Sequence, residues 1–195
     1  MGTKSRLVCG NSLEKNSQTA DRWSQFTKAQ PAPLYFWYRQ SPRYLESERA
    51  DNFGWVTESD PKYTSASGLI TLNLDPAGRL IWFIAVPPQV DAPADKSPPS
   101  DWAPLFAAAG LDPAAFTPTE STWTPLTVCD TRAAWTGAYP DQPDIPIRIE
   151  AAGYRGKPVH FAVVTPWSRP WLAEGAPQNT GQNIGFAITL TLVIG

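Results

Sequence analysis

The sequence contains few of the residues on which catalytic and metal sites most often depend. It has one histidine, His160, and two cysteines, Cys9 and Cys129, in no metal-ligand spacing. This composition leaves little room for a zinc site or a Ser-His-Asp triad. Phosphate-loop, dinucleotide-binding, HExxH, GxSxG and protein-kinase motifs are absent as well. We therefore expect no catalytic residue, no metal site and no cofactor.

Cys9 and Cys129 allow two interpretations. They could form a disulfide, but Cys9 lies in a polar leader with little predicted structure, so we favour two unpaired thiols. Residues 1–16 have no apolar core and resemble neither a secretory signal nor a transit peptide. We expect 1–30 to be a poorly ordered leader that ends in a short helix, with Trp23 and Phe26 on one face.

The chain also lacks an excess of positive charge. Its formal net charge is -2, which removes the general electrostatic attraction to nucleic acid. We therefore expect no nucleic-acid partner.

Proline is abundant, with 21 residues among 195. Together with 13 glycines, it argues against long helices and favours short strands and turns. The pattern predicts an α+β protein of two small β-rich units, built from antiparallel hairpins or sheets, each with a short helix.

The first β-rich unit is expected over residues 31–90. A strand is predicted at Leu34–Arg39, and a hairpin is predicted from Gly68–Leu74 and Arg79–Val86 around the turn sequence DPAG. Residues 91–100 belong to a proline-rich stretch and are expected to form a linker.

The second unit is expected over residues 101–175. Asp101 should cap a helix in DWAPLFAAAG, and DTRAAWTG at Asp130–Gly137 is predicted to form another capped helical turn. A second hairpin is predicted from Ile145–Ala151 and Pro158–Thr165, around the turn sequence YRGK. The similarity of YFWYRQSPRYL to HFAVVTPWSRPWL suggests a distant internal repeat.

Residues 35–44, YFWYRQSPRY, combine aromatic rings with two arginines. Such a stretch could be a binding surface for bases, but no second basic run lies nearby. Bulky residues on both faces favour a strand packed on both sides, with Arg39 and Arg43 where the chain leaves the interior. The nine tryptophans are spread along the chain, which favours core anchors over a carbohydrate-binding platform.

No pair of carboxylates has the spacing of an acid-base site. Glu150 is expected to form an ion pair with Arg148 on the same strand face, and Asp130 is expected to cap a helical turn. His160 is expected to be a neutral, hydrogen-bonded residue. An enzyme would require Glu150, His160 and Asp130 to converge in one pocket.

The stretch at 184–195, IGFAITLTLVIG, is apolar and uncharged. It is shorter than the roughly 20 residues that span a bilayer. Its β-branched residues favour a buried strand, whereas its apolar character is also typical of the first half of a transmembrane helix.

Several long strings resemble one family. YFWYRQSPRYL, LDPAGRLIWFIAVPPQV, DWAPLFAAAGLDPAAFTPTESTWTP, DTRAAWTGAYP and IRIEAAGYRGKPVHF are similar to the non-catalytic region of membrane-bound serine/threonine protein kinases of acidobacterial type. The resemblance covers about 33–167 and includes no kinase catalytic motif. It implies that 184–195 is the truncated start of a membrane span and that the globular part is extracytoplasmic.

The resemblance implies a non-catalytic sensory or spacer domain, with the membrane and an unknown ligand as partners. A carbohydrate- or peptide-binding periplasmic module is the alternative, and an uncharacterised enzyme is a weaker one. Residues at strand ends form the candidate ligand groove: Arg39, Arg43, Tyr154, Arg155 and Trp167.

Overall fold

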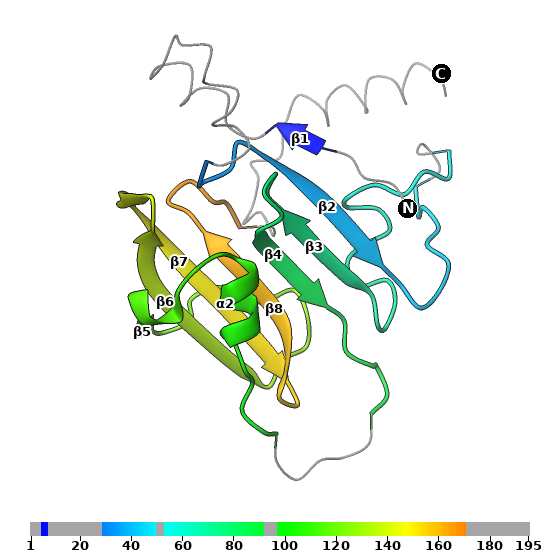
Figure 1. Ribbon diagram of the computed structural model, residues 1–195. Coiled ribbons are helices and arrows are strands. Elements are labelled where there is room, and N and C mark those ends of the chain that lie inside the picture. The colour runs from blue at the N-terminus through cyan, green and yellow to red at the C-terminus, as the bar shows by residue number, and fades with distance from the viewer. Residues whose placement is uncertain (1–4, 8–28, 50–52, 92–96, 171–195) are drawn as a thin grey trace, which may run out of the picture.

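A computed structural model of the chain describes residues 5–7, 29–49, 53–91 and 97–170, with only the backbone of 5–7 described. The described residues form one eight-stranded sheet in the order β1-β2-β3-β4-β8-β7-β6-β5 (Figure 1). Every neighbouring pair of strands in this sheet is antiparallel.

In the described ranges, strands are accompanied by one short α-helix and one 3-10 turn. The strands are β1 Ser5–Leu7, β2 Leu34–Gln40, β3 Ile70–Leu74, β4 Leu80–Ala85, β5 Thr117–Thr119, β6 Thr131–Tyr139, β7 Gln142–Tyr154 and β8 Lys157–Val164. The helices are α2 Ala103–Ala108 and a 3-10 turn, Pro113–Ala115.

Both predicted hairpins are present, as β3–β4 and β7–β8. In the first turn, the Asp75 carboxylate accepts hydrogen bonds from the backbone N–H groups of Ala77 and Arg79, at 2.9 and 2.8 Å. In the second turn, Arg155 and Gly156 have φ angles of 51° and 76°. Two successive positive φ angles are typical of the two-residue turn that matches strand twist.

The two hairpins lie in one continuous sheet. β4 pairs with β8 through Trp82 opposite Ala162 and Ile84 opposite His160. The division into two separate units, each with its own helix, is therefore not confirmed. What the structure does show is a β-rich protein with little helix.

Residues 131–139 correct one prediction. The sequence DTRAAWTG was expected to form a helical turn, but Thr131–Tyr139 is strand β6 and pairs along β7. Alanine has a high helix propensity, and the pairing with β7 overrides this local preference.

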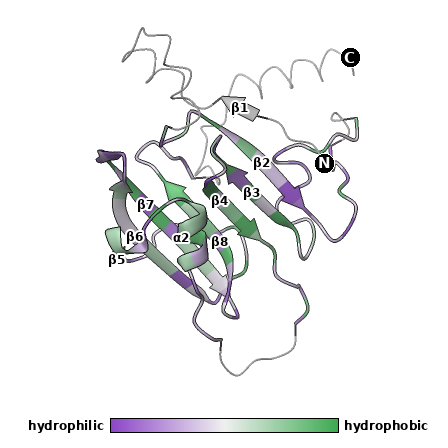
Figure 2. Ribbon diagram, viewed as in Figure 1, coloured by the Kyte–Doolittle hydropathy of each residue, from purple (hydrophilic) through white to green (hydrophobic). Residues whose placement is uncertain are grey.

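One face of the sheet carries the apolar core beneath α2. Phe106, which is 1% exposed, packs edge-on against the rings of Phe116, Trp135 and Phe161 at centroid distances of 5.6, 5.1 and 5.7 Å. Hydrophobic residues from β4, from β7 and from the segment after α2 complete this cluster: Leu80, Leu111, Ile147, Ile149 and Ala151. Figure 2 shows the apolar stretches of the central strands that lie behind α2.

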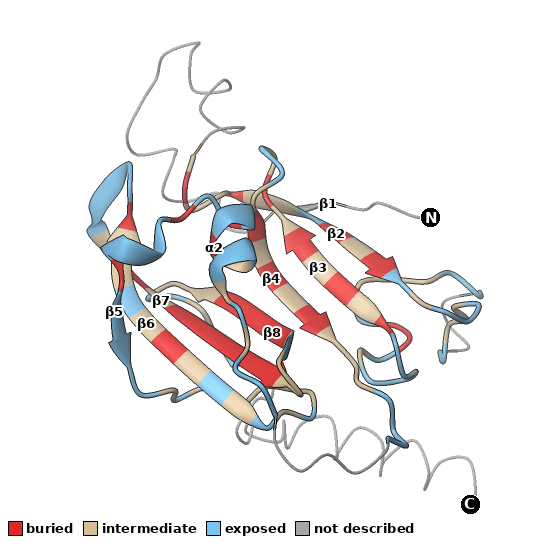
Figure 3. Ribbon diagram, turned by 60° about the horizontal axis from the view of Figure 1, so that its bottom comes forward, coloured by how far each residue is buried: buried red, intermediate tan, exposed pale blue. Residues whose placement is uncertain are grey.

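The opposite face of the sheet, which we call the polar face, is also buried, and its buried polar residues surround a small apolar cluster of Trp82, Ile84 and Ala162. Its buried polar residues are Arg39, Thr71, Asn73, Glu150 and His160. Two irregular segments, 53–69 and 120–128, cover this face. Tyr63 of the first segment packs edge-on against Trp82, and Leu126 of the second packs against the same cluster. Figure 3 shows buried positions along β3, β4, β7 and β8.

Strand β2 differs from the prediction in two respects. Trp37 is buried as expected, at 6% exposure, but Phe36 on the other face is 38% exposed. The strand is therefore not packed on both sides, because α2 lies over the other half of the sheet (Figure 1). Arg39 was expected where the chain leaves the interior, and instead it is buried.

Several predictions fall outside the described residues. They concern Cys9, the helix over 19–29 except for its last residue, and the apolar run 184–195. Cys129 has a free thiol.

Candidate functional site

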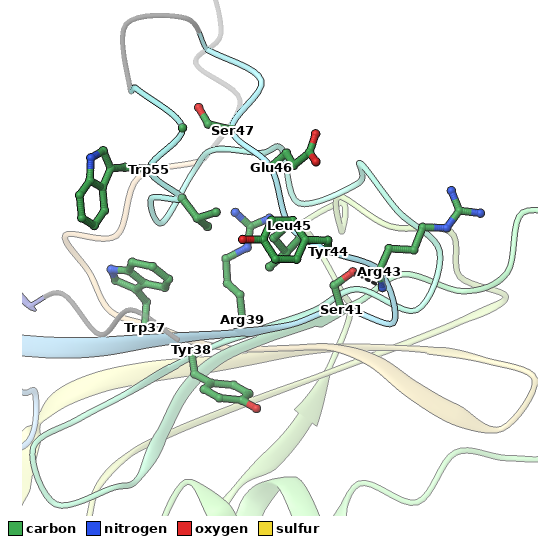
Figure 4. A pocket seen from close by; sticks show the side chains of 12 residues that line it. Trp37, Tyr38, Arg39, Ser41, Arg43, Tyr44, Leu45, Glu46, Ser47 and Trp55 are labelled. Atoms are coloured by element: carbon green, nitrogen blue, oxygen red, sulfur yellow. Dashed lines mark hydrogen bonds between the residues drawn. The ribbon is translucent and has the colours of Figure 1, made fainter.

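A cavity of about 830 Å³ lies between β2 and the segment that follows it (Figure 4). Its lining combines aromatic, charged and small polar side chains from these two stretches: Trp37, Tyr38, Arg39, Ser41, Arg43, Tyr44, Leu45, Glu46, Ser47, Gly54, Trp55 and Val56. We call it the β2 cavity. Its volume is within the range of small-molecule sites, which is about 300–1,000 Å³.

The local sequence explains why the cavity forms here. Trp37 and Arg39 are two positions apart, so they project from the same face of β2. The strand ends at Gln40, and the hydroxyl of Ser41 accepts a hydrogen bond from the N–H of Arg43 at 3.1 Å. The chain then passes over the face that bears Trp37 and Arg39.

Asp60 fixes the returning segment. Its carboxylate accepts hydrogen bonds from the hydroxyl of Ser47 and from the N–H of Glu48, the latter at 3.0 Å. Asp60 is 4% exposed, so these hydrogen bonds compensate for its burial. The outer wall of the cavity is thus tied to the segment that covers the sheet.

Arg39 forms part of the cavity lining closest to the sheet. Its Nη1 donates to the carbonyl of Thr57 at 3.2 Å, and its Nη2 donates to the carbonyl of Lys62 at 3.3 Å. The guanidinium also lies 5.6 Å from the ring centroid of Tyr63. Burial lowers the pKa of Arg39, but an arginine side chain stays charged in proteins.

Aromatic rings line the cavity from both sides. Trp37 projects from β2, whereas Tyr44 and Trp55 come from the segments that follow this strand (Figure 4). Trp55 is 70% exposed and Tyr44 is 90% exposed. Indole and phenol rings left exposed beside a cavity are suited to contact with the flat face of a ligand.

A second cavity, of about 560 Å³, lies at the opposite end of the sheet. It is lined in part by Gln30, Tyr139 and Trp167 and by the ion pair between Asp75 and Arg79, whose Oδ2 and Nε are 2.5 Å apart. Burial raises the pKa of Tyr139 to about 12. This ion pair also stabilises the β3–β4 turn, so its two charged groups already have a structural role.

The structure separates the five predicted groove residues into three places. Arg39 and Arg43 line the β2 cavity, and Trp167 lines the second cavity. Tyr154 and Arg155 lie at the β7–β8 turn, where Arg155 Nη1 is 2.9 Å from the Asp91 carboxylate.

Sequence reasoning missed the aromatic lining of the β2 cavity. Trp55 was considered a core anchor, and Tyr44 was noted only as the end of the aromatic stretch. The sequence did contain a signal, because Trp55 follows Phe53 and Gly54 in a short apolar piece outside any predicted strand.

Glu150, His160 and Asp130 do not meet in either cavity. Glu150 is 1% exposed, and its carboxylate accepts hydrogen bonds from Ser121 Oγ at 2.7 Å, Thr122 N at 3.1 Å and Arg148 Nε. The predicted Arg148–Glu150 ion pair is therefore confirmed.

His160 lies on the same sheet face as Glu150 and is affected by its charge, whereas Asp130 has partners of its own. Burial lowers the pKa of His160 to about 4, and its Nδ1 atom has no hydrogen-bond partner. The Asp130 carboxylate accepts hydrogen bonds from Ser97 and from the N–H of Arg155, which lower its pKa. None of the three lines either cavity described above.

In the described ranges, no group of three or more His, Cys, Asp or Glu side chains could hold a metal ion. No helix within those ranges has the length and apolar character needed to cross a membrane. No family model, curated protein or solved structure matches the chain.

Proposed function

We propose that this chain is a non-catalytic ligand-binding module that acts as the sensory or spacer region of a membrane-bound serine/threonine protein kinase. The β2 cavity carries the binding part of this proposal, because exposed aromatic rings there surround a buried cation. The kinase part rests on the resemblance of about 33–167 to the non-catalytic region of such kinases.

In this proposal, the apolar run 184–195 begins a membrane span and the sheet lies outside the cytoplasm. A ligand that binds one conformation more tightly than another shifts the population toward it. The segment over β2 is the part suited to respond, because it both lines the cavity and covers the sheet.

Tryptophan fluorescence of the full chain tests the binding function. A ligand library screened against the wild-type protein should yield compounds that change the emission, because Trp37 and Trp55 line the cavity. Trp55→Ala should weaken their binding about tenfold or more, while Trp167→Ala, in the second cavity, should leave it unchanged. Equal loss in both variants would contradict assignment to the β2 cavity.

A carbohydrate- or peptide-binding module independent of any kinase is the second candidate. The exposed rings of Trp55 and Tyr44 favour it, since such rings also stack on sugars. The genomic DNA on both sides of the reading frame separates the two candidates. A kinase frame upstream with apolar spans downstream would support the first, and unrelated genes would support the second.

We also propose that the two halves of the sheet derive from one duplicated unit. The meander β2-β3-β4 meets the meander β8-β7-β6 through the central β4–β8 pair, so the strand order is mirrored about this pair. The sequence similarity of the stretches beginning at Tyr35 and His160 does not follow this arrangement, because it relates β2 to β8, whereas the strand order relates β2 to β6.

A further inference from the structure

We propose that the β2 cavity binds a compound with one carboxylate and a ring, aromatic or sugar, that presents a flat face to indole, with the carboxylate on Arg39 and the ring between Trp37 and Trp55. This inference rests on the proposed binding function and names its ligand class. It is carried by the hydrogen bonds of Arg39, by the positions of the rings and by the charges at the cavity.

Arg39 has donors left over. Its two terminal nitrogens each donate one hydrogen bond to a backbone carbonyl, and each has a second N–H. Its Nε is buried without a partner. A buried guanidinium is normally paired with a carboxylate, and the fork of N–H groups matches carboxylate geometry.

The nearest carboxylates do not supply this pairing. Asp60 and Glu48 lie close enough to raise the pKa of Arg39, yet no ion pair joins either of them to it among the described residues. Asp60 instead accepts hydrogen bonds from Ser47 and from the N–H of Glu48. The remaining N–H groups of Arg39 are therefore available to donate hydrogen bonds to a ligand.

The ring of the ligand is inferred from Trp37 and Trp55. They come from different segments and face the same space, with the Arg39 guanidinium beside it (Figure 4). A flat ring placed there would contact indole on two sides, and its carboxylate would reach Arg39. Each aromatic contact contributes about 0.5–1.5 kcal/mol beyond the burial of its area.

The charge of the lining favours one negative charge on the ligand. Arg39 and Arg43 are opposed by Glu46 within the same lining. A polyanion such as a nucleic acid or polyphosphate would meet the Glu46 carboxylate and a chain of net charge -2. A single carboxylate meets Arg39 without a second charge to accommodate.

Isothermal titration of the full chain with four probes tests the ligand class. The probes are indole-3-acetate and its neutral amide, indole-3-acetamide, together with galacturonate and galactose. We expect at least one acid to bind ten times or more tightly than its neutral partner, which corresponds to about 1.4 kcal/mol. Preference for indole-3-acetate identifies an aromatic acid, and preference for galacturonate identifies an acidic sugar.

Variants then locate the binding. Arg39→Gln should remove the preference for the acid over the neutral probe, and Trp55→Ala should weaken both. Arg132→Gln is the matched control, because it removes an exposed arginine that lines neither cavity. Near-UV circular dichroism reports whether Arg39→Gln folds, and the comparison of acid with neutral probe on the wild-type protein needs no variant.

Two outcomes would overturn the inference. One is equal binding of acids and neutral partners, and the other is no binding of any probe. If no probe binds but the library screen finds a ligand that depends on Trp55, the ligand class is wrong and the binding function stands. If the screen also fails, both are wrong.

Discussion

His160, the single histidine in the chain, lies in the polar face of the sheet. It is 9% exposed, opposite Ile84 on β4, and its ring lies edge-on to Trp82 at 6.3 Å. Burial lowers its pKa to about 4, against a smaller opposing effect of Glu150. The folded protein thus holds this imidazole neutral under conditions in which an unfolded chain would protonate it.

The pH dependence of stability should reflect this difference. The unfolded chain protonates His160 below about pH 6.5, whereas the folded protein does so only near pH 4. The stabilisation due to neutral His160 is therefore complete above pH 6.5 and lost as the pH falls toward 4. The full loss is about 3 kcal/mol in the free energy of unfolding.

Urea unfolding of wild type and His160→Phe at pH 7 and pH 5 measures this loss. The variant keeps a ring at the site and should lose less stability between the two pH values than wild type. Carboxylates titrate in both proteins, so they cancel in the comparison. Identical losses would show that His160 does not cause the pH dependence.

Gly137 in β6 leaves room for an aromatic ring. A Cβ atom at this position would lie 2.6 Å from Cδ1 of Phe116, which is closer than side chains approach one another. Phe116 is 7% exposed and belongs to the core under α2, so it has little space to move. Gly137→Ala should lower the free energy of unfolding by about 1–3 kcal/mol.

Thr136→Ala is the matched control for this prediction, because Thr136 is the exposed neighbour in the same strand. It should change the free energy of unfolding by less than about 0.5 kcal/mol. Both changes are measured by urea unfolding. Equal effects would mean that contact with Phe116 does not determine the residue at 137.

At the scale of elements, the β7–β8 turn combines a backbone requirement with an ion pair. Arg155 has a φ of 51°, and its guanidinium bonds to Asp91, which joins the turn to the chain just before 92–96. Asparagine tolerates positive φ, whereas a β-branched residue does not. The two contributions can therefore be separated by two substitutions at one position.

Arg155→Asn should keep the turn and lose the ion pair, at a cost of about 0.2–1 kcal/mol. Arg155→Val should lose both and cost about 1–3 kcal/mol. Thermal unfolding of the two variants gives the difference. Equal destabilisation would show that backbone conformation at 155 has no separate contribution.

The elements differ in how much of them could be predicted. The β3–β4 and β7–β8 hairpins have local signals, DPAG and YRGK, because turn residues and flanking alternation occur within a few positions. Strand β6 has no such signal, since its alanines favour helix and its pairing with β5 and β7 stabilises it as a strand. Propensity failed where pairing with neighbouring strands decided the structure.

The candidate site was predicted only in part for the same reason. Arg39 and Arg43 were named because of the aromatic stretch that contains them. Trp55 could not be assigned to the same site, since its position over Trp37 depends on the path of the segment that Asp60 fixes. Tyr154, Arg155 and Trp167 were grouped with them because all lie near strand ends. Strands end on two opposite sides of a sheet, so such residues need not lie close together.

At the scale of the molecule, the two meanders are joined by backbone only through 86–130, whereas their strands meet at β4 and β8. At the opposite end of the sheet, Gln30 and Ser168 line one cavity, so the ends of the described core lie near each other. In a chain whose ends are joined, residues 171–195 and 1–4 would connect Pro170 to strand β1. This geometry predicts that the protein still folds when the order of its two halves along the chain is exchanged.

A circular permutant tests this prediction. It joins Gly195 to Met1 and opens the chain between Lys96 and Ser97. It should fold with a stability within about 2 kcal/mol of wild type, because changes of loop length have small entropic costs. Near-UV circular dichroism and urea unfolding measure the result.

The control permutant opens the chain between Glu150 and Ala151, inside the buried strand β7. It should not reach the native near-UV spectrum. If the first permutant fails like the control, the connection 86–130 is needed for the fold and the halves are not interchangeable in order.

The polar face of the sheet affects which part of the protein unfolds first. Several buried atoms there have no hydrogen-bond partner among the described residues: Arg39 Nε, Thr71 Oγ1, Asn73 Oδ1 and His160 Nδ1. Each such atom costs about 1–3 kcal/mol, and water reaching it would recover that cost. The covering segment 53–69 should therefore detach before the core beneath α2 does.

Amide hydrogen exchange would separate these two layers. Backbone N–H groups in 53–69 should exchange by local opening, whereas those of β7 and β8 should exchange only when the whole domain unfolds. A compound bound between Trp37 and Trp55 would then slow exchange in the first group and leave the second unchanged. Ligand binding would therefore suppress the local opening of 53–69 and leave the stability of the underlying sheet unchanged.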